Sequence, residues 1–151
     1  MTAKKLFVFV LAVKIILVGI VFILFGEGRF IWADTAHYAG LGRNIFLGNG
    51  FSFTGEGGLF EPTTAFMPLY PALLGFFSLY LPYGYVILAL LQAAAAACTA
   101  LFTYRIGTFF LSDRWAALAA LLFVFEPLVS AIHVLMMPET FFVLFILMFA
   151  Y

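Results

Sequence analysis

Residues 6–25, LFVFVLAVKIILVGIVFILF, decide the fold class of this chain. The stretch is apolar except for Lys14, and about 20 such residues in a helix cross a hydrocarbon core about 30 Å thick. The basic pair Lys4 and Lys5 precedes it, as in the charged start of a signal peptide, but no small-residue cleavage site follows. We therefore interpret it as an uncleaved first membrane span.

The composition of the whole chain supports a membrane protein. Hydrophobic types make up 66% of the 151 residues and charged types only 9%, whereas soluble domains have about 45–50% and about 25%. Seven basic residues balance seven acidic ones without a basic run, which argues against nucleic acid as a partner. A single cysteine, Cys98, excludes an intrachain disulfide and a cysteine-based zinc cluster.

Three further apolar stretches predict additional spans. Residues 83–103 and 115–137 are long enough to cross a bilayer, whereas residues 140–151 rise about 18 Å and form only the start of a fourth span. We therefore expect residues 1–151 to be the N-terminal part of one transmembrane domain in a longer protein. The predicted fold class is all-α: a polytopic transmembrane helical bundle, with amphipathic helices in its first outer loop.

That outer loop, residues 26–82, holds most of the glycines and predicts turns at Gly48-Asn49-Gly50 and at residues 55–58. Within it, residues 67–81 are apolar but rise only about 22 Å as a helix. Pro68 and Pro71 suit the first turn of such a helix. A stretch of this length is typical of an interfacial or re-entrant helix.

The positive-inside rule gives the expected orientation. Lys4 and Lys5 place the N-terminus in the cytoplasm. If residues 67–81 do not cross, Arg105 and Arg114 also lie on the cytoplasmic side, and we prefer this arrangement although two arginines of the outer loop count against it. The expected location is a multi-pass protein of the plasma membrane, with its outer loop extracytoplasmic.

Asp34 opens a predicted amphipathic helix in which Tyr38, Leu41 and Ile45 fall near one face. One interpretation is that Asp34 only caps this helix, because aspartate is favoured at N-caps. The other is a carboxylate held at the outer membrane surface as a general base or metal ligand. His37 could share its face, but two residues do not define a metal site.

Glu139 follows Pro138 at the outer end of the third span. It is either a solvated carboxylate near a helix N-terminus, where the dipole favours negative charge, or part of a site. In the preferred orientation it lies on the same side of the membrane as Asp34, so the two carboxylates could share one site. His133, less than two turns earlier, is either a buried hydrogen-bonded histidine or a group lining a cavity.

Two ionisable residues, Lys14 and Glu126, lie within predicted spans, where charge is costly and is usually directed into the bundle or a cavity. A structural Lys14–Glu126 pair and a functional pocket are equally compatible with the sequence. Pro127, beside Glu126, cannot donate a backbone hydrogen bond and predicts a kink in the third span.

The prolines of residues 61–71, EPTTAFMPLYP, fix the backbone direction where the chain re-enters the interface. This segment is either a rigid connector or one wall of a substrate groove, with Glu61 as another outer carboxylate.

Together these residues resemble the start of a GT-C-fold glycosyltransferase, of the group related to protein O-mannosyltransferases and the lipid A aminoarabinose transferase. That family has an outer loop opening with Asp, a Tyr four residues later, and a small-residue helix ending in Gly-x-Gly. Here these are Asp34, Tyr38 and Gly48-Asn49-Gly50-Phe51. Residues 62–71 are similar to the Pro-Thr-Ala-x-x-Pro-Leu-Tyr-Pro-like stretch that follows.

The resemblance continues through the rest of the chain. Arg105 stands in the short cytoplasmic loop, Pro127 in the next span, and Glu139 before the span after that. Two positions depart from the family pattern: Thr35 replaces a frequent second acid, and Met67 stands where a basic residue is common.

The resemblance implies an inverting transfer of a sugar from a polyprenyl-phosphate donor to a lipid, glycan or protein acceptor at the extracytoplasmic face of the cell envelope. It implies Asp34 as the catalytic base or acceptor-orienting group, and Glu139 as the second acidic position. Membrane lipid is an expected partner, and some relatives use a divalent cation. The candidate substrate-binding residues are His37, Tyr38, Arg43, Glu61, Tyr70 and His133.

Two other classes remain open from the sequence. The chain could be a segment of a transporter or channel, with Lys14 and Glu126 lining a path. It could also be a non-catalytic membrane subunit. The long outer loop that carries Asp34 favours the enzyme.

Overall fold

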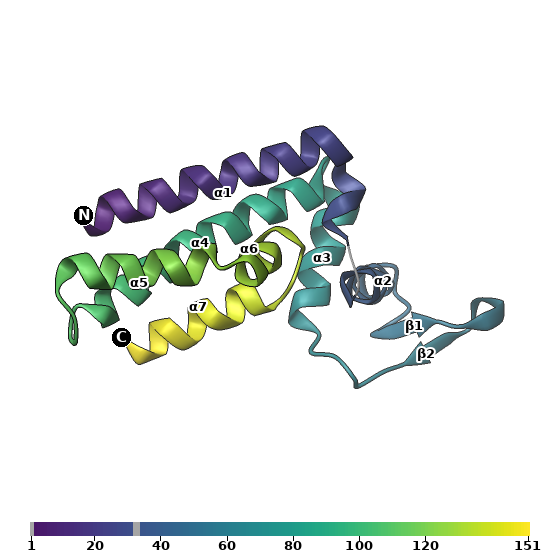
Figure 1. Ribbon diagram of the computed structural model, residues 1–151. Coiled ribbons are helices and arrows are strands. Elements are labelled where there is room, and N and C mark those ends of the chain that lie inside the picture. The colour runs from purple at the N-terminus through teal and green to yellow at the C-terminus, as the bar shows by residue number, and fades with distance from the viewer. Residues whose placement is uncertain (1, 32–33) are drawn as a thin grey trace.

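The computed structural model describes residues 2–31 and 34–151, and α-helices occupy most of them. Four pieces form a bundle with α4 at its centre, and two further helices with a small hairpin lie at one end of it (Figure 1). The bundle consists of α1 (Ala3–Phe25), α4 (Gly84–Gly107), the pair α5 (Asp113–Phe125) and α6 (Pro127–Val134), and α7 (Glu139–Ala150).

Two of these helices, α1 and α4, are long and apolar enough to cross a membrane. They correspond to the predicted spans 6–25 and 83–103. The predicted span 115–137 is divided into α5 and α6, which form a third span only if the bent pair is counted as one. A protein with membrane-spanning helices is therefore the class that the fold supports.

Small side chains in α4 allow its neighbours to approach closely. Ala97 and Ala100 are buried against Leu6 and Val10 of α1 and against Ala120 of α5. In an apolar bundle, van der Waals packing of small residues is a main source of helix association. The run of alanines therefore explains why α4 lies at the centre.

The predicted kink at Pro127 is present as a break of 60° between α5 and α6. The break leaves the carbonyl of Val124 without the partner that a continuous helix would supply. The Lys14 ammonium, which is fully buried, donates to this carbonyl at 3.0 Å and to the Ser130 hydroxyl at 2.9 Å. Ser130 also donates to the same carbonyl at 3.1 Å, and the ring of Phe125 lies 5.2 Å from the ammonium.

The suggested Lys14–Glu126 pair is replaced by two separate contacts. Glu126 is exposed, and its carboxylate accepts from the backbone N–H of Val129 at 2.7 Å, so it caps the first turn of α6. Lys14 donates to a backbone carbonyl on the buried side of the break, and Glu126 accepts from a backbone N–H on its exposed side. The two residues therefore do not face one path through the bundle.

We expect Lys14→Ala to lower the free energy of unfolding in detergent by about 2–4 kcal/mol, because it removes buried hydrogen bonds and leaves a cavity. Lys4→Ala, an exposed lysine on the same helix, is the matched control and should change stability by no more than about 0.5 kcal/mol. Equal unfolding midpoints for the two variants would contradict this role of Lys14.

The other end of the bundle is covered by residues 26–83, which leave α1 and return to α4 at the same end (Figure 1). A short 3-10 helix η1 (Glu27–Phe30) is followed by α2 (Asp34–Phe46), and α3 (Leu69–Tyr80) leads back into α4. The amphipathic helix predicted at Asp34 is therefore present. Asp34 lies in its first turn, and the preceding position lies outside the described residues. The prolines Pro68 and Pro71 open α3, as predicted.

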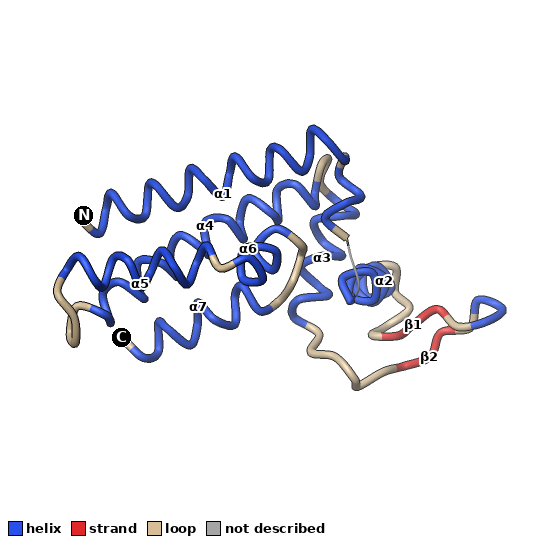
Figure 2. The backbone as a smooth tube through the Cα atoms, in the orientation of Figure 1, coloured by secondary structure: helices blue, strands red, loops and turns tan. Residues whose placement is uncertain are grey.

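Between α2 and α3 the chain forms a hairpin that an all-α prediction missed. Strands β1 (Ser52–Thr54) and β2 (Phe60–Pro62) pair antiparallel with Phe53 opposite Glu61, and a 3-10 turn η2 (Glu56–Gly58) joins them (Figure 2, red). Strands of this length show no periodic pattern in a sequence. The glycine turns were predicted correctly, since Gly48, Gly50, Gly57 and Gly58 have positive φ.

A glycine contact fixes α2 against α3. A Cβ atom added to Gly42 would collide with the carbonyl of Pro71, and one added to Gly75 would collide with the backbone of Gly42. The two backbones therefore touch directly, which only glycine permits. This contact determines which face of α2 is turned toward α3.

We expect Gly42→Ala to separate α2 from α3 and to destabilise the protein by about 1–3 kcal/mol through overpacking. Gly40→Ala, on the same helix but with open space around the added methyl group, should be neutral or slightly stabilising. Thermal unfolding of both variants in detergent checks this, and similar losses for both would show that the contact is unimportant.

Candidate functional site

A cavity of about 360 Å³ lies where α2, α3 and the start of α7 meet. It is at the end of the bundle that carries α2 and the hairpin (Figure 1). Aromatic side chains dominate its walls, and one of its lining residues is acidic. The lining residues are Tyr38, Ala65, Phe66, Met67, Tyr70, Pro138, Glu139 and Phe142.

Side chains from other elements donate hydrogen bonds to the connection between α6 and α7. This connection carries Pro138 into the cavity wall. Thr35 of α2 donates to the carbonyl of Met136 at 3.1 Å. Gln92 of α4 donates to the carbonyl of Met137 at 2.7 Å. In an apolar bundle, irregular backbone needs such partners. These bonds bring the first turn of α7 next to the first turn of α2.

Gln92 also positions Tyr70, on the opposite wall of the cavity. Its side-chain N–H donates to the Tyr70 hydroxyl at 3.2 Å. Because that hydroxyl accepts from Gln92, its own proton remains available for a ligand. Burial and the nearby charge of Glu139 raise the pKa of Tyr70, so it stays a neutral donor.

Tyr38 packs edge-on against both aromatic neighbours, with ring centroids 5.7 Å from Tyr70 and 5.3 Å from Phe66. Its pKa is raised, first by burial and then by the charges of Glu139 and Asp34. Both carboxylates therefore act on the same hydroxyl. Tyr38 is also a neutral hydrogen-bond donor at ordinary pH.

The two predicted catalytic carboxylates occupy different places around this cavity. Glu139, in the first turn of α7, lines it. Asp34, one helical turn before Tyr38, is exposed and lies outside the lining. Both are near a helix N-terminus, where negative charge is stabilised. The structure thus places a carboxylate in the wall and another within electrostatic range of the same tyrosine.

The other predicted substrate-binding residues divide into two groups. His37 is exposed and stacks on Phe66, with centroids 6.4 Å apart, so it borders the cavity. Arg43 lines a different cavity. Glu61 is exposed on β2, and His133 is buried within α6, with no partner for its Nδ1 among the described residues. Neither Glu61 nor His133 lines the aromatic cavity.

The side chains of the described residues do not form a metal-binding site. In residues 2–31 and 34–151, no group of three His, Cys, Asp or Glu side chains could hold a metal ion.

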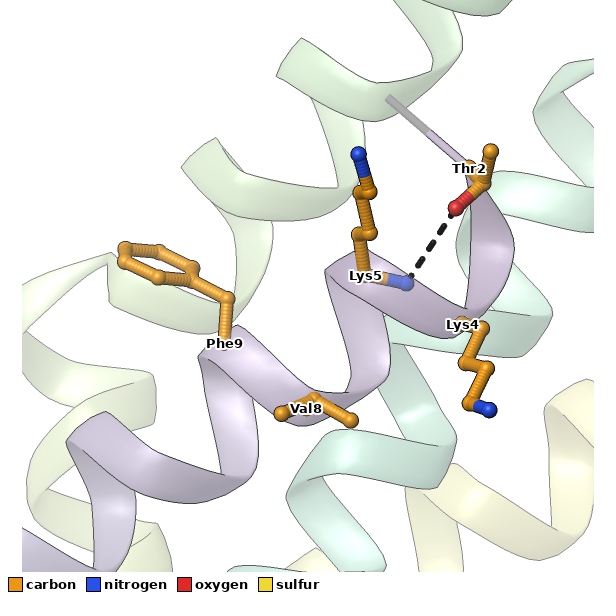
Figure 3. A pocket seen from close by; sticks show the side chains of 5 residues that line it. All are labelled: Thr2, Lys4, Lys5, Val8 and Phe9. Carbon is orange, nitrogen blue, oxygen red and sulfur yellow. Dashed lines mark hydrogen bonds between the residues drawn. The ribbon is translucent and has the colours of Figure 1, made fainter.

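A larger hollow of about 510 Å³ at the start of α1 is a weaker candidate. Figure 3 shows Lys4 and Lys5 among its lining residues, with their ammonium groups pointing away from each other. The Thr2 hydroxyl there accepts from the backbone N–H of Lys5, at 3.4 Å, and caps α1. Diverging charges do not converge on a ligand, so we place the site at the aromatic cavity.

Sequence reasoning missed Gln92 and Thr35. Gln92 is the glutamine of α4, and a polar side chain within an apolar span marks an interhelical contact by default. Thr35 was noted only for replacing an acid. Their roles depend on residues more than 40 positions away, which no local pattern reveals.

No family model, no curated protein and no solved structure matches this chain.

We expect Gln92→Leu to loosen the α6–α7 connection, because the Met137 carbonyl loses its buried donor. Amide hydrogen exchange over residues 135–140 should become faster. Thr99→Val on the same helix is the matched control, since the Thr99 hydroxyl is buried without a partner among the described residues and its loss should cost nothing. Unchanged exchange in Gln92→Leu would contradict the assigned contact.

Proposed function

We propose that this protein is a membrane glycosyltransferase of the GT-C kind. It transfers a sugar from a polyprenyl-phosphate-linked donor to an acceptor at the extracytoplasmic membrane face. The single observation that carries the proposal is the aromatic cavity lined by Glu139, with Asp34 one helical turn before its lining residue Tyr38, at the end of the bundle opposite the N-terminus.

The proposed reaction needs a base on the acceptor side. An acceptor hydroxyl oxygen attacks the anomeric carbon of the sugar while the bond to the phosphate oxygen breaks. The hydroxyl proton passes to the carboxylate of Asp34, and the phosphate leaves with the electron pair of the broken bond. Because the attacking oxygen enters opposite the leaving phosphate, the configuration is inverted. Asp34 is exposed, so its carboxylate can meet an acceptor arriving from outside.

The cavity walls suit a sugar ring. Tyr38 and Tyr70 supply neutral hydroxyl donors, and Glu139 supplies an acceptor for sugar hydroxyl groups. Aromatic faces cover the apolar side of the ring. In this proposal Glu139 orients the substrate and Asp34 takes the proton.

The counter-charge for the leaving phosphate is not in the described cavity lining, because none of its residues is basic. Lys14 is committed to the α5–α6 break, and Arg29 lies over the ring of Phe25. The proposal therefore places the cation outside this lining.

The test is sugar transfer by membranes containing the protein, measured with tritiated polyprenyl-phosphate-mannose and polyprenyl-phosphate-glucose. Transfer to the lipid, glycan and protein fractions is counted separately. We expect Asp34→Asn to lower turnover by at least about 100-fold, since it removes the base. Glu139→Gln should lower turnover and should also raise KM, because Glu139 lines the cavity.

Asp113→Asn, an exposed acidic residue in the first turn of α5, is the matched control and should keep full turnover. Helix content by circular dichroism should be the same in all variants. Near-normal turnover in Asp34→Asn would refute its role as base, and absence of transfer from both donors by the unaltered protein would count against the proposed donor class.

A further inference from the structure

Arg43 lines a second cavity, of about 300 Å³, between α2, α3 and the start of α4. This cavity shares no lining residue with the aromatic cavity. Arg43 follows Tyr38 by five positions, which turns it roughly 140° around α2. Its lining residues are Ala39, Gly40, Arg43, Ser78, Leu79 and Tyr85, among which the guanidinium is the charged group.

The position of Tyr85 gives the depth of this cavity in a bilayer. It is the second residue of α4, a helix of 24 residues that is apolar enough to span. Such a helix rises about 36 Å, more than a hydrocarbon core of about 30 Å. The first turn of α4, and the cavity beside it, therefore lie at the level of the lipid headgroups.

Exposed aromatic side chains lie on α2 and α3, the two helices that contribute most of the cavity lining. Phe46, one turn after Arg43, packs against Phe76 and Tyr80, with centroids 6.2 Å and 5.6 Å away. The three are 37%, 44% and 58% exposed. Tyrosine is enriched at membrane interfaces because its ring is apolar and its hydroxyl is polar, and the two phenylalanines add apolar surface beside it. A cation beside such a patch matches a molecule with an anionic head and apolar chains.

The hydrogen-bond donors of the cavity are few. The Ser78 hydroxyl already donates to the carbonyl of Gly75 at 3.2 Å. The Glu27 carboxylate accepts from the backbone N–H of Tyr85 at 2.8 Å and does not line the cavity. The guanidinium of Arg43 and the hydroxyl of Tyr85 are left as donors, and a guanidinium binds phosphate with two parallel N–H bonds.

We propose that this cavity binds the phosphate of an anionic phospholipid headgroup, with Arg43 as its cationic anchor. The aromatic patch of Phe46, Phe76 and Tyr80 lies against the acyl chains. The bound lipid holds the α2–α3 pair on the outer membrane surface. This inference rests on the membrane-spanning helices and the Arg43 cavity, and it is independent of sugar transfer.

The experiment uses the whole chain in a neutral detergent. Phosphatidylglycerol, phosphatidylcholine with the same acyl chains, and inorganic phosphate are titrated separately. Lipid retention is measured by native mass spectrometry, and stabilisation by the thermal unfolding midpoint. We expect phosphatidylglycerol to be retained in preference to phosphatidylcholine, with a higher midpoint. Arg43→Gln should weaken its binding at least about tenfold, through loss of charge-assisted hydrogen bonds.

Arg29→Gln is the matched control, because Arg29 is an exposed arginine at the same end of the molecule that lies over Phe25. It should retain phosphatidylglycerol as the unaltered protein does. Arg43 is exposed on α2, so its substitution should leave helix content unchanged.

Four outcomes would overturn the proposal. Arg43→Gln could bind phosphatidylglycerol as tightly as the unaltered protein, or both lipids could bind equally. Inorganic phosphate could stabilise the protein through Arg43 at concentrations comparable to the lipid, which would assign the cavity to a free anion. Loss of sugar transfer in Arg43→Gln with lipid retention intact would likewise contradict the lipid role, and would move Arg43 to the transfer reaction.

Discussion

One buried carbonyl group determines how the bundle is built. Where α5 ends, the Val124 carbonyl has no partner in its own helix, and an apolar interior offers no water to supply one. Lys14, from α1, and Ser130, from α6, both donate to it. The break can therefore persist inside the bundle, and it turns α6 by 60°.

The same constraint applies at the next irregular segment. Between α6 and α7 the carbonyls of Met136 and Met137 accept from Thr35 and Gln92, which belong to α2 and α4. Each of these bonds satisfies a buried polar group and also sets the position of Glu139. The hydrogen bonds that satisfy these two carbonyls therefore also place one wall of the aromatic cavity.

Local patterns in the sequence were sufficient for the helices and for the break. Apolar length identified α1 and α4, Asp34 marked the first turn of α2, and Pro127 marked the break. Local patterns could not reveal which faces of α2 lead to which cavity. That depends on the direct backbone contact between Gly42 and Gly75, which is non-local. The sequence predicted Arg43 as a substrate-binding residue, but Arg43 lines another cavity, because this contact decides where each face of α2 points. The membrane orientation and the catalytic roles stay predictions.

The separation of charges between the two cavities bears on the proposed reaction. Glu139 in the cavity wall and Asp34 nearby disfavour an anion there, because like charges repel. A donor phosphate would then lie on the far side of the sugar ring from these carboxylates. An inverting displacement requires this order, with the base and the acceptor on one face of the anomeric carbon and the leaving phosphate on the other. The absence of a basic residue from the described lining is therefore consistent with a cavity that receives the acceptor and the sugar, while the phosphate stays nearer the membrane with its lipid tail.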